Sequence, residues 1–97
     1  MLAIRNVQTE IHVQPGQESR HVITDETYPE WGDDCPMILL SPQISLRVPC
    51  YVEGRSIVVE LNAMDSCFPQ PSVGFSVSAF YDGKMTRVAS GYIRRQS

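Results

Sequence analysis

The sequence contains no long apolar run. The longest, Met37-Ile38-Leu39-Leu40, is the size of a strand, whereas a helix needs roughly 20 apolar residues to cross a bilayer. We therefore expect no transmembrane helix and no membrane partner. The N-terminus also lacks a basic segment followed by an apolar stretch and a cleavage site. We expect a cytoplasmic protein or a component of a virion.

Cysteine is scarce, and basic residues do not outnumber acidic ones. Cys35, Cys50 and Cys67 are odd in number and widely spaced, which favours reduced thiols over a disulfide framework. No two cysteines or histidines have the close spacing typical of zinc ligands, so we expect no metal and no cofactor. The net charge of −3 argues against nucleic acid as a partner, because non-specific binding relies on many Lys and Arg contacts with phosphates.

Helical periodicity is absent as well, and the dominant spacing of apolar residues is two. That spacing places side chains on one face of a pleated strand. It predicts strands over residues 7–14, 19–24, 37–40, 43–49, 55–62, 73–81 and 84–94.

Proline, glycine and aspartate define the ends of these strands. Pro36 and Pro42 enclose one strand and place it near a sheet edge, where a missing N–H does least harm. Pro49 is expected to end the next strand, which we expect to form a hairpin with 55–62. Asp82-Gly83 predicts a hairpin of 73–81 with 84–94, because a type I′ turn needs positive φ at both central residues.

The pattern predicts the fold class. A chain of 97 residues is too short for two independent cores, so we expect one all-β domain over residues 1–97. Six to seven strands with turns at short intervals favour a small antiparallel β-sandwich, with a small barrel as the alternative.

Residues 25–36 have no period and are expected to form a long acidic loop. Its first ten residues hold five carboxylates and two aromatic residues. Aromatic anchors surrounded by charge suit a protein interface, whereas a tryptophan that covers the open end of the sandwich is an equally supported alternative. We take the interface as the hypothesis, formed by Tyr28, Glu30, Trp31, Asp33 and Asp34.

The alternative site is basic and consists of Lys84, Arg87, Arg94 and Arg95. These side chains could contact phosphates, but the sequence shows no aromatic platform or groove-binding helix beside them. A solvated edge that prevents sheets from aggregating is the simpler interpretation.

No phosphate-binding loop, nucleophile elbow or paired catalytic carboxylates can be recognised. The sequence therefore favours a non-catalytic interaction or assembly protein that binds another protein or copies of itself. A viral or phage structural or accessory component would fit this description. A β-domain that binds a small ligand or nucleic acid is the alternative, and a small enzyme comes third.

Overall fold

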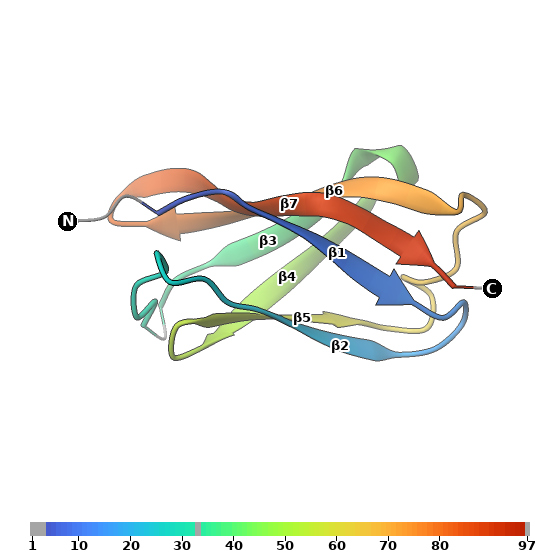
Figure 1. Ribbon diagram of the computed structural model, residues 1–97, viewed down its shortest axis with the longest axis horizontal. Coiled ribbons are helices and arrows are strands. Elements are labelled where there is room, and N and C mark those ends of the chain that lie inside the picture. The colour runs from blue at the N-terminus through green and yellow to red at the C-terminus, as the bar shows by residue number, and fades with distance from the viewer. Residues whose placement is uncertain (1–3, 33, 97) are drawn as a thin grey trace.

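The computed structural model describes residues 4–32 and 34–96, and it is all-β, as the sequence predicts. The strands alternate buried and exposed residues, and Figure 1 shows their arrangement. They are β1 (Val7–Val13), β2 (Ser19–Ile23), β3 (Met37–Ser41), β4 (Leu46–Glu53), β5 (Ser56–Leu61), β6 (Ser72–Tyr81) and β7 (Lys84–Arg95), with a 3-10 turn, η1 (Pro42–Ile44), before β4. The described residues include no helix long and apolar enough to cross a membrane.

The seven strands form one sheet in the order β1-β7-β6-β3-β4-β5-β2. The sheet curls until its edge strands, β1 and β2, approach each other, so that it resembles a nearly closed barrel (Figure 1). The sheet is mixed because β1 runs parallel to β7, which corrects the purely antiparallel arrangement expected. These two strands are far apart in sequence, so no short turn fixes their relative direction.

β4 joins the two halves of the curled sheet. Of the seven strands, it differs most from its predicted bounds, 43–49. Its first half, Leu46–Cys50, pairs with β3, and its second half, Tyr51–Glu53, pairs with β5 around the turn at Gly54-Arg55. The prediction that Pro49 ends the strand is therefore wrong. Pro49 lies where β4 is paired only with β3, so a missing N–H is tolerated there.

β3 lies in the middle of the sheet, between β6 and β4, and the prediction of an edge position is wrong. Pro36 and Pro42 fall just outside the strand, so neither removes a hydrogen bond from the ladder.

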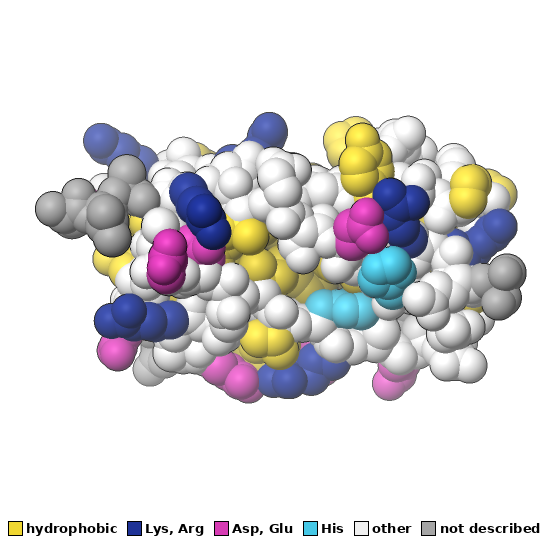
Figure 2. Space-filling view, in the orientation of Figure 1, with side chains coloured by type: hydrophobic (Ala, Val, Ile, Leu, Met, Phe, Trp, Pro, Cys, Tyr) yellow, Lys and Arg dark blue, Asp and Glu magenta, His cyan; other side chains and the backbone are white. Residues whose placement is uncertain are grey.

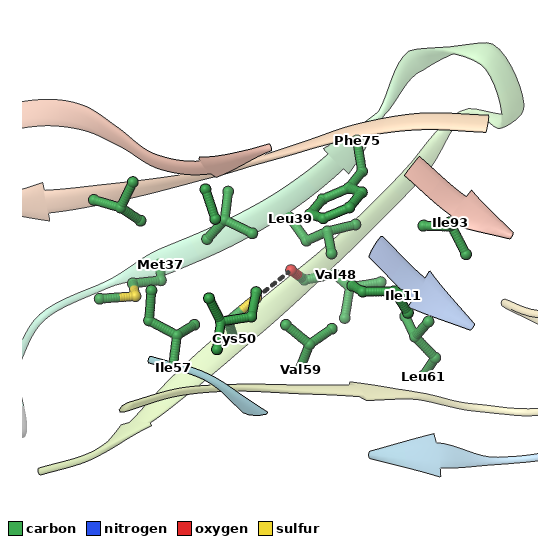
Figure 3. Packing of buried hydrophobic residues seen from close by; sticks show 14 of the residues in the cluster. Ile11, Met37, Leu39, Val48, Cys50, Ile57, Val59, Leu61, Phe75 and Ile93 are labelled. Atoms are coloured by element: carbon green, nitrogen blue, oxygen red, sulfur yellow. Dashed lines mark hydrogen bonds between the residues drawn. The ribbon is translucent and has the colours of Figure 1, made fainter. Parts of the chain in front are cut away.

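The inward-facing residues of all strands form a single core. Figure 3 shows part of it, where Leu39 and Phe75 face Val59 across the interior. Strands β1 and β2 point Ile11, Val13 and Ile23 inward, as their alternation predicts.

Two irregularities in β7 fix how it sits between β1 and β6. Gly91 has a φ of +151°, and a Cβ at this position would lie 1.7 Å from the backbone oxygen of Thr9 in β1. Only glycine fits there. In addition, the register shifts between Val77 and Ser78 of β6, so that both Val88 and Ala89 are buried in succession on β7. This bulge leaves a backbone group without a ladder partner.

The hairpin between β6 and β7 is confirmed. Asp82 and Gly83 have φ of 52° and 76°, which matches the type I′ turn that the sequence predicts.

Candidate interaction surface

The described part of residues 25–36, namely 25–32 and 34–36, includes no strand, as expected, and it covers one end of the barrel. This end also carries the β4–β5 turn and the tip of the β6–β7 hairpin (Figure 1). Tyr28 is 1% exposed and Trp31 is 4% exposed. The expectation that the two aromatic side chains are exposed is wrong, and the alternative of a tryptophan that covers the open end is what the structure shows.

Tyr28 is held by the bulge in β7. Its hydroxyl donates a hydrogen bond of 2.6 Å to the backbone oxygen of Val88, a residue of the stretch where the β6–β7 register shifts. Burial raises the pKa of Tyr28 to about 12, so the hydroxyl keeps its proton and remains a donor at neutral pH. The Tyr28 hydroxyl thus donates a hydrogen bond to a carbonyl at the point where the ladder between β6 and β7 is distorted.

Trp31 is held by the β4–β5 turn. Its indole Nε1 donates to the backbone oxygen of Arg55 at 3.0 Å, and its backbone N–H donates to Gly54 at 3.2 Å. The indole packs at an angle on Tyr28 and edge-on to Tyr81, with ring centroids 5.2 and 5.4 Å apart. These contacts satisfy the polar atom of the ring and bury its apolar area.

Apart from Asp25, the charged side chains that the structure describes in this segment remain on the surface. Asp25 accepts hydrogen bonds from Arg5 and Thr27, and these hold the pKa of its carboxyl at about 2. Glu30 and Asp34 are exposed, and Asp33 lies outside the described residues. The segment can therefore offer a partner negative charge, but its aromatic side chains already belong to the core.

The four residues of the alternative basic site do not form one patch. Arg95 shares a register row with the buried Val13, and its Nη1 donates to the backbone oxygen of Phe68. Arg94 lies on the opposite face, where its Nε is 2.9 Å from Glu10. Lys84 begins β7 beside the hairpin turn, and Arg87 is exposed further along the strand. A continuous phosphate-binding stripe is not formed.

The solvent side of five neighbouring strands, β1, β7, β6, β3 and β4, lies on the outside of the curled sheet, and we call it the outer face. Strand registers and burial alternation define its members. They are Gln8, Glu10 and His12 on β1; Met85, Arg87, Ser90, Tyr92 and Arg94 on β7; Ser72, Gly74, Ser76, Ser78 and Phe80 on β6; Ile38 and Leu40 on β3; and Arg47 and Pro49 on β4.

Large apolar side chains are exposed on the outer face. Phe80 and Met85 are cross-strand partners and are 48% and 64% exposed, and Tyr92 is 53% exposed. Sequence reasoning missed them, although a signal was present. Because Phe75, Val77 and Ala79 alternate inward on β6, the same period places Phe80 outward.

Two of the hollows on the described surface adjoin members of the outer face. One, of about 680 Å³, lies where β4 separates from β5 and has Val48 and Leu61 among its lining residues, beside charged Arg47 and Glu60. The other, of about 450 Å³, lies on the outer face beside Tyr92 and is bordered by Gln43 of η1. Both are open grooves rather than enclosed pockets.

Of the three free cysteines, Cys35 and Cys50 are buried and Cys67 is exposed. Burial raises the pKa of Cys50 to about 11 and also raises that of Cys35, which keeps both thiols protonated and unreactive at neutral pH. The two histidine side chains lie side by side where β1 meets β2 (Figure 2), and burial, followed by the charge of His12, lowers the pKa of His21. Within residues 4–32 and 34–96, no three His, Cys, Asp or Glu side chains are grouped to hold a metal ion.

No protein-family model matches the chain, and no curated protein sequence matches it either. Any functional assignment therefore rests on the chemistry of this surface.

Proposed function

We propose that the chain is a non-catalytic interaction domain that binds another protein, or a second copy of itself, through the outer face. The observation that carries the proposal is the exposure of Phe80, Met85 and Tyr92 on one side of one sheet. A folded domain that leaves large apolar side chains exposed together on one face is expected to cover them with a partner.

The composition of the outer face supports a protein partner. Aromatic residues, Met and Arg are enriched at the cores of protein interfaces, and Lys, Glu and Asp are depleted. Among the members of the outer face defined above, Glu10 is the only carboxylate, and Arg94 pairs with it at 2.9 Å. The outer face therefore presents apolar side chains and arginines to solvent, with a single carboxylate among its members.

The solvent side of β2, β5 and the end of β4 provides a contrast. Val22 and Tyr51 are exposed there, next to two polar side-chain pairs. Arg20 pairs with Glu53 at 2.9 Å, and the Tyr51 hydroxyl donates to Glu60. Between them Val58 is fully buried although it lies outside the main core. This surface leaves two large apolar side chains exposed, whereas the outer face leaves three, of which Tyr92 has the Arg94 guanidinium over its ring.

Affinity capture with matched variants tests the proposal. Immobilised wild type, Tyr92→Ser, Met85→Ser and the control Val22→Ser would be exposed to an extract of the native source, and the bound proteins would be quantified. We expect wild type and Val22→Ser to retain the same partner, while either outer-face variant loses about tenfold or more of it. Equal retention by all four proteins, or no specific retention by wild type, would overturn the proposal.

A viral or phage particle is one setting in which such a domain would act as a structural or accessory component. This remains a prediction, made because the chain is small and because its sequence contains no recognisable catalytic motif. Immunodetection of the chain in purified particles from the source would test it.

A further inference from the structure

We infer that the groove between β4 and β5 binds an extended peptide segment of another protein, which adds as a strand to the free edge of β4. The groove lies at the rim of the outer face, and Phe80, Met85 and Tyr92, on which the proposed function rests, are not among its lining residues. The inference therefore goes beyond the proposed function, and either of the two can fail without the other.

β4 and β5 are paired only next to their turn. Starting from the turn, the ladder ends at the pair of Tyr51 and Val58, and beyond this pair the two strands diverge (Figure 1). Pro49 accounts for the separation. It would occupy the next hydrogen-bonded position of the ladder, where it has no N–H to donate to β5.

The separation leaves backbone groups of both strands without a strand partner. β3 pairs with one side of Leu46–Cys50, and the ladder with β5 does not reach the other side. Ladder bonds alternate in direction along a strand, so the N–H and C=O of Arg47 and the C=O of Pro49 point into the groove. On the opposite wall, the same alternation directs the N–H and C=O of Glu60 into it. Such unpaired groups are a template for another strand.

The groove suits a single extended segment better than the edge of a folded sheet. Its volume is about 680 Å³, within the roughly 300–1,000 Å³ of sites that bury a ligand. The free edge lies between two strands of the same domain, where an isolated strand can enter and a second sheet would meet β5. Proline and charged residues also discourage sheets from joining edge to edge, and Pro49 and Arg47 occupy this edge. Addition of one peptide strand to a sheet edge is a common mode of recognition.

The side chains of the groove specify the sequence of the peptide. A strand antiparallel to β4 would form three backbone hydrogen bonds, two with Arg47 and one with the carbonyl of Pro49. Its residue opposite Val48 would point toward Val48 and Leu61, which are buried and apolar. The residue after it would lie opposite Arg47, whose exposed side chain favours a carboxylate. We therefore expect an apolar residue followed directly by Asp or Glu.

The other charged groups of the groove are less available to the peptide. Glu60 accepts a hydrogen bond from the hydroxyl of Tyr51, and Arg20 pairs with Glu53 at 2.9 Å. Asp65 accepts a hydrogen bond from the backbone of the next loop. The guanidinium of the residue on the free edge itself is therefore the group that should select the charge of the bound strand.

Selection from a displayed library of random peptides longer than the unpaired part of β4, with the whole chain as bait, tests the inference. We expect the enriched peptides to share the apolar–acidic pair. A synthetic copy of an enriched peptide should slow hydrogen exchange at the backbone N–H of Arg47, which faces the groove in the free protein. N-methylation along the synthetic peptide should weaken binding at every second amide, because ladder bonds have that period.

Arg47→Pro and Arg47→Ala are matched variants. Proline removes the N–H that faces the groove without removing a bond to β3, so we expect it to weaken peptide binding about tenfold or more. Alanine keeps the N–H and removes only the ion pair, so we expect a loss of about fivefold or less. Arg47→Glu should change the selected acidic residue to Lys or Arg. Circular dichroism would verify that the variants fold.

The inference would be overturned by a library that yields no enriched peptide, or by enriched peptides that bind Arg47→Pro as tightly as wild type. If Arg47→Pro does not fold, the N-methylated peptides decide with the wild-type protein, and a loss of binding without a period of two would contradict strand addition. Tyr92→Ser, which tests the proposed function, should bind the peptide as wild type does. A failure of the outer face is thereby distinguished from a failure of the groove.

Discussion

The β6–β7 hairpin and residues 25–36 contact each other through the hydrogen bond from Tyr28 to Val88, yet they are held in place by different forces. The hairpin is a continuous ladder between strands adjacent in sequence. Within residues 25–36, the residues that the structure describes include no strand and depend on buried side chains and on separate hydrogen bonds to β6, β7 and the β4–β5 turn. A segment without regular structure is thus held in place by side chains rather than by backbone geometry.

This difference leads to a general expectation. Substitutions in the hairpin should be costly where they demand a different backbone conformation. Substitutions in residues 25–36 should be costly where they remove buried side-chain atoms. The following changes test that division.

Gly91→Ala should have the largest effect, because a Cβ at this position would collide with the backbone of Thr9. About 1–3 kcal/mol for backbone strain and about 1–3 kcal/mol for overpacking add to roughly 2–6 kcal/mol of lost stability. A domain of this size has only about 5–10 kcal/mol. Urea unfolding would measure the loss. Gly74→Ala is the control, since its Cβ would make only ordinary contacts, and equal losses in both would refute the backbone explanation.

Trp31→Ala should destabilise the domain by about 3–5 kcal/mol, as removal of a buried aromatic side chain does. Thermal unfolding would show the change. Phe80→Ala is the matched control, because this aromatic residue is about half exposed, and we expect a loss below about 1 kcal/mol. If Trp31→Ala left the melting temperature unchanged, the indole would not be part of the core in solution.

The fold could be predicted from the sequence wherever neighbouring residues determine the structure. Alternation over 7–13 and the Asp82-Gly83 turn are local signals, and the structure confirms both. The passage of β4 through Pro49 and the burial of Trp31 depend on which distant strands lie beside them. Composition alone shows that Trp31 is surrounded by carboxylates, but it does not show that Arg55 supplies an acceptor for the indole.

The candidate surface divides in the same way. The outward position of Phe80 and Met85 follows from strand period and hairpin register, both available in the sequence. Their union with Tyr92, Glu10 and Arg47 on one face requires the order of strands β1, β7, β6, β3 and β4. That order includes a parallel pairing between the two ends of the chain, which no local rule predicts.

Tyr28→Phe should cost about 1–3 kcal/mol, because the carbonyl of Val88 would lose its buried donor. This change tests the link between the two regions, since it removes one atom and leaves the ring in place. Hydrogen exchange should show faster opening around the bulge in β7. Tyr92→Phe is the control and should change stability by less than about 0.5 kcal/mol. Similar losses in both would show that the Tyr28 bond contributes nothing.

Gly83→Val should cost about 1–2 kcal/mol, because valine strongly disfavours the positive φ of the type I′ turn. Lys84→Ala, one residue further, should stay within about 0.5 kcal/mol. Chemical unfolding of both variants would compare them. Equal effects would mean that the turn conformation does not hold the hairpin together.

The smallest effect concerns Asp25, whose contacts with Arg5 and Thr27 join the chain before β1 to the start of residues 25–36. Because the pKa of Asp25 falls from 3.8 to about 2 on folding, the ionised carboxylate favours the folded state. Its contribution is fully present above about pH 4 and is lost as the pH falls toward 2. Arg5 is largely exposed, so solvent screening keeps the contribution small.

Melting temperatures at pH 5, 4, 3 and 2 for wild type and Asp25→Asn would isolate this term, since the other carboxylates titrate alike in both proteins. We expect wild type to be the more stable protein at pH 5 and the difference to shrink between pH 4 and 2. Asp34→Asn, which changes an exposed carboxylate of the same segment, should run parallel to wild type. A constant difference between wild type and Asp25→Asn would show that ionisation of Asp25 does not stabilise the segment, and that the asparagine acts through packing alone.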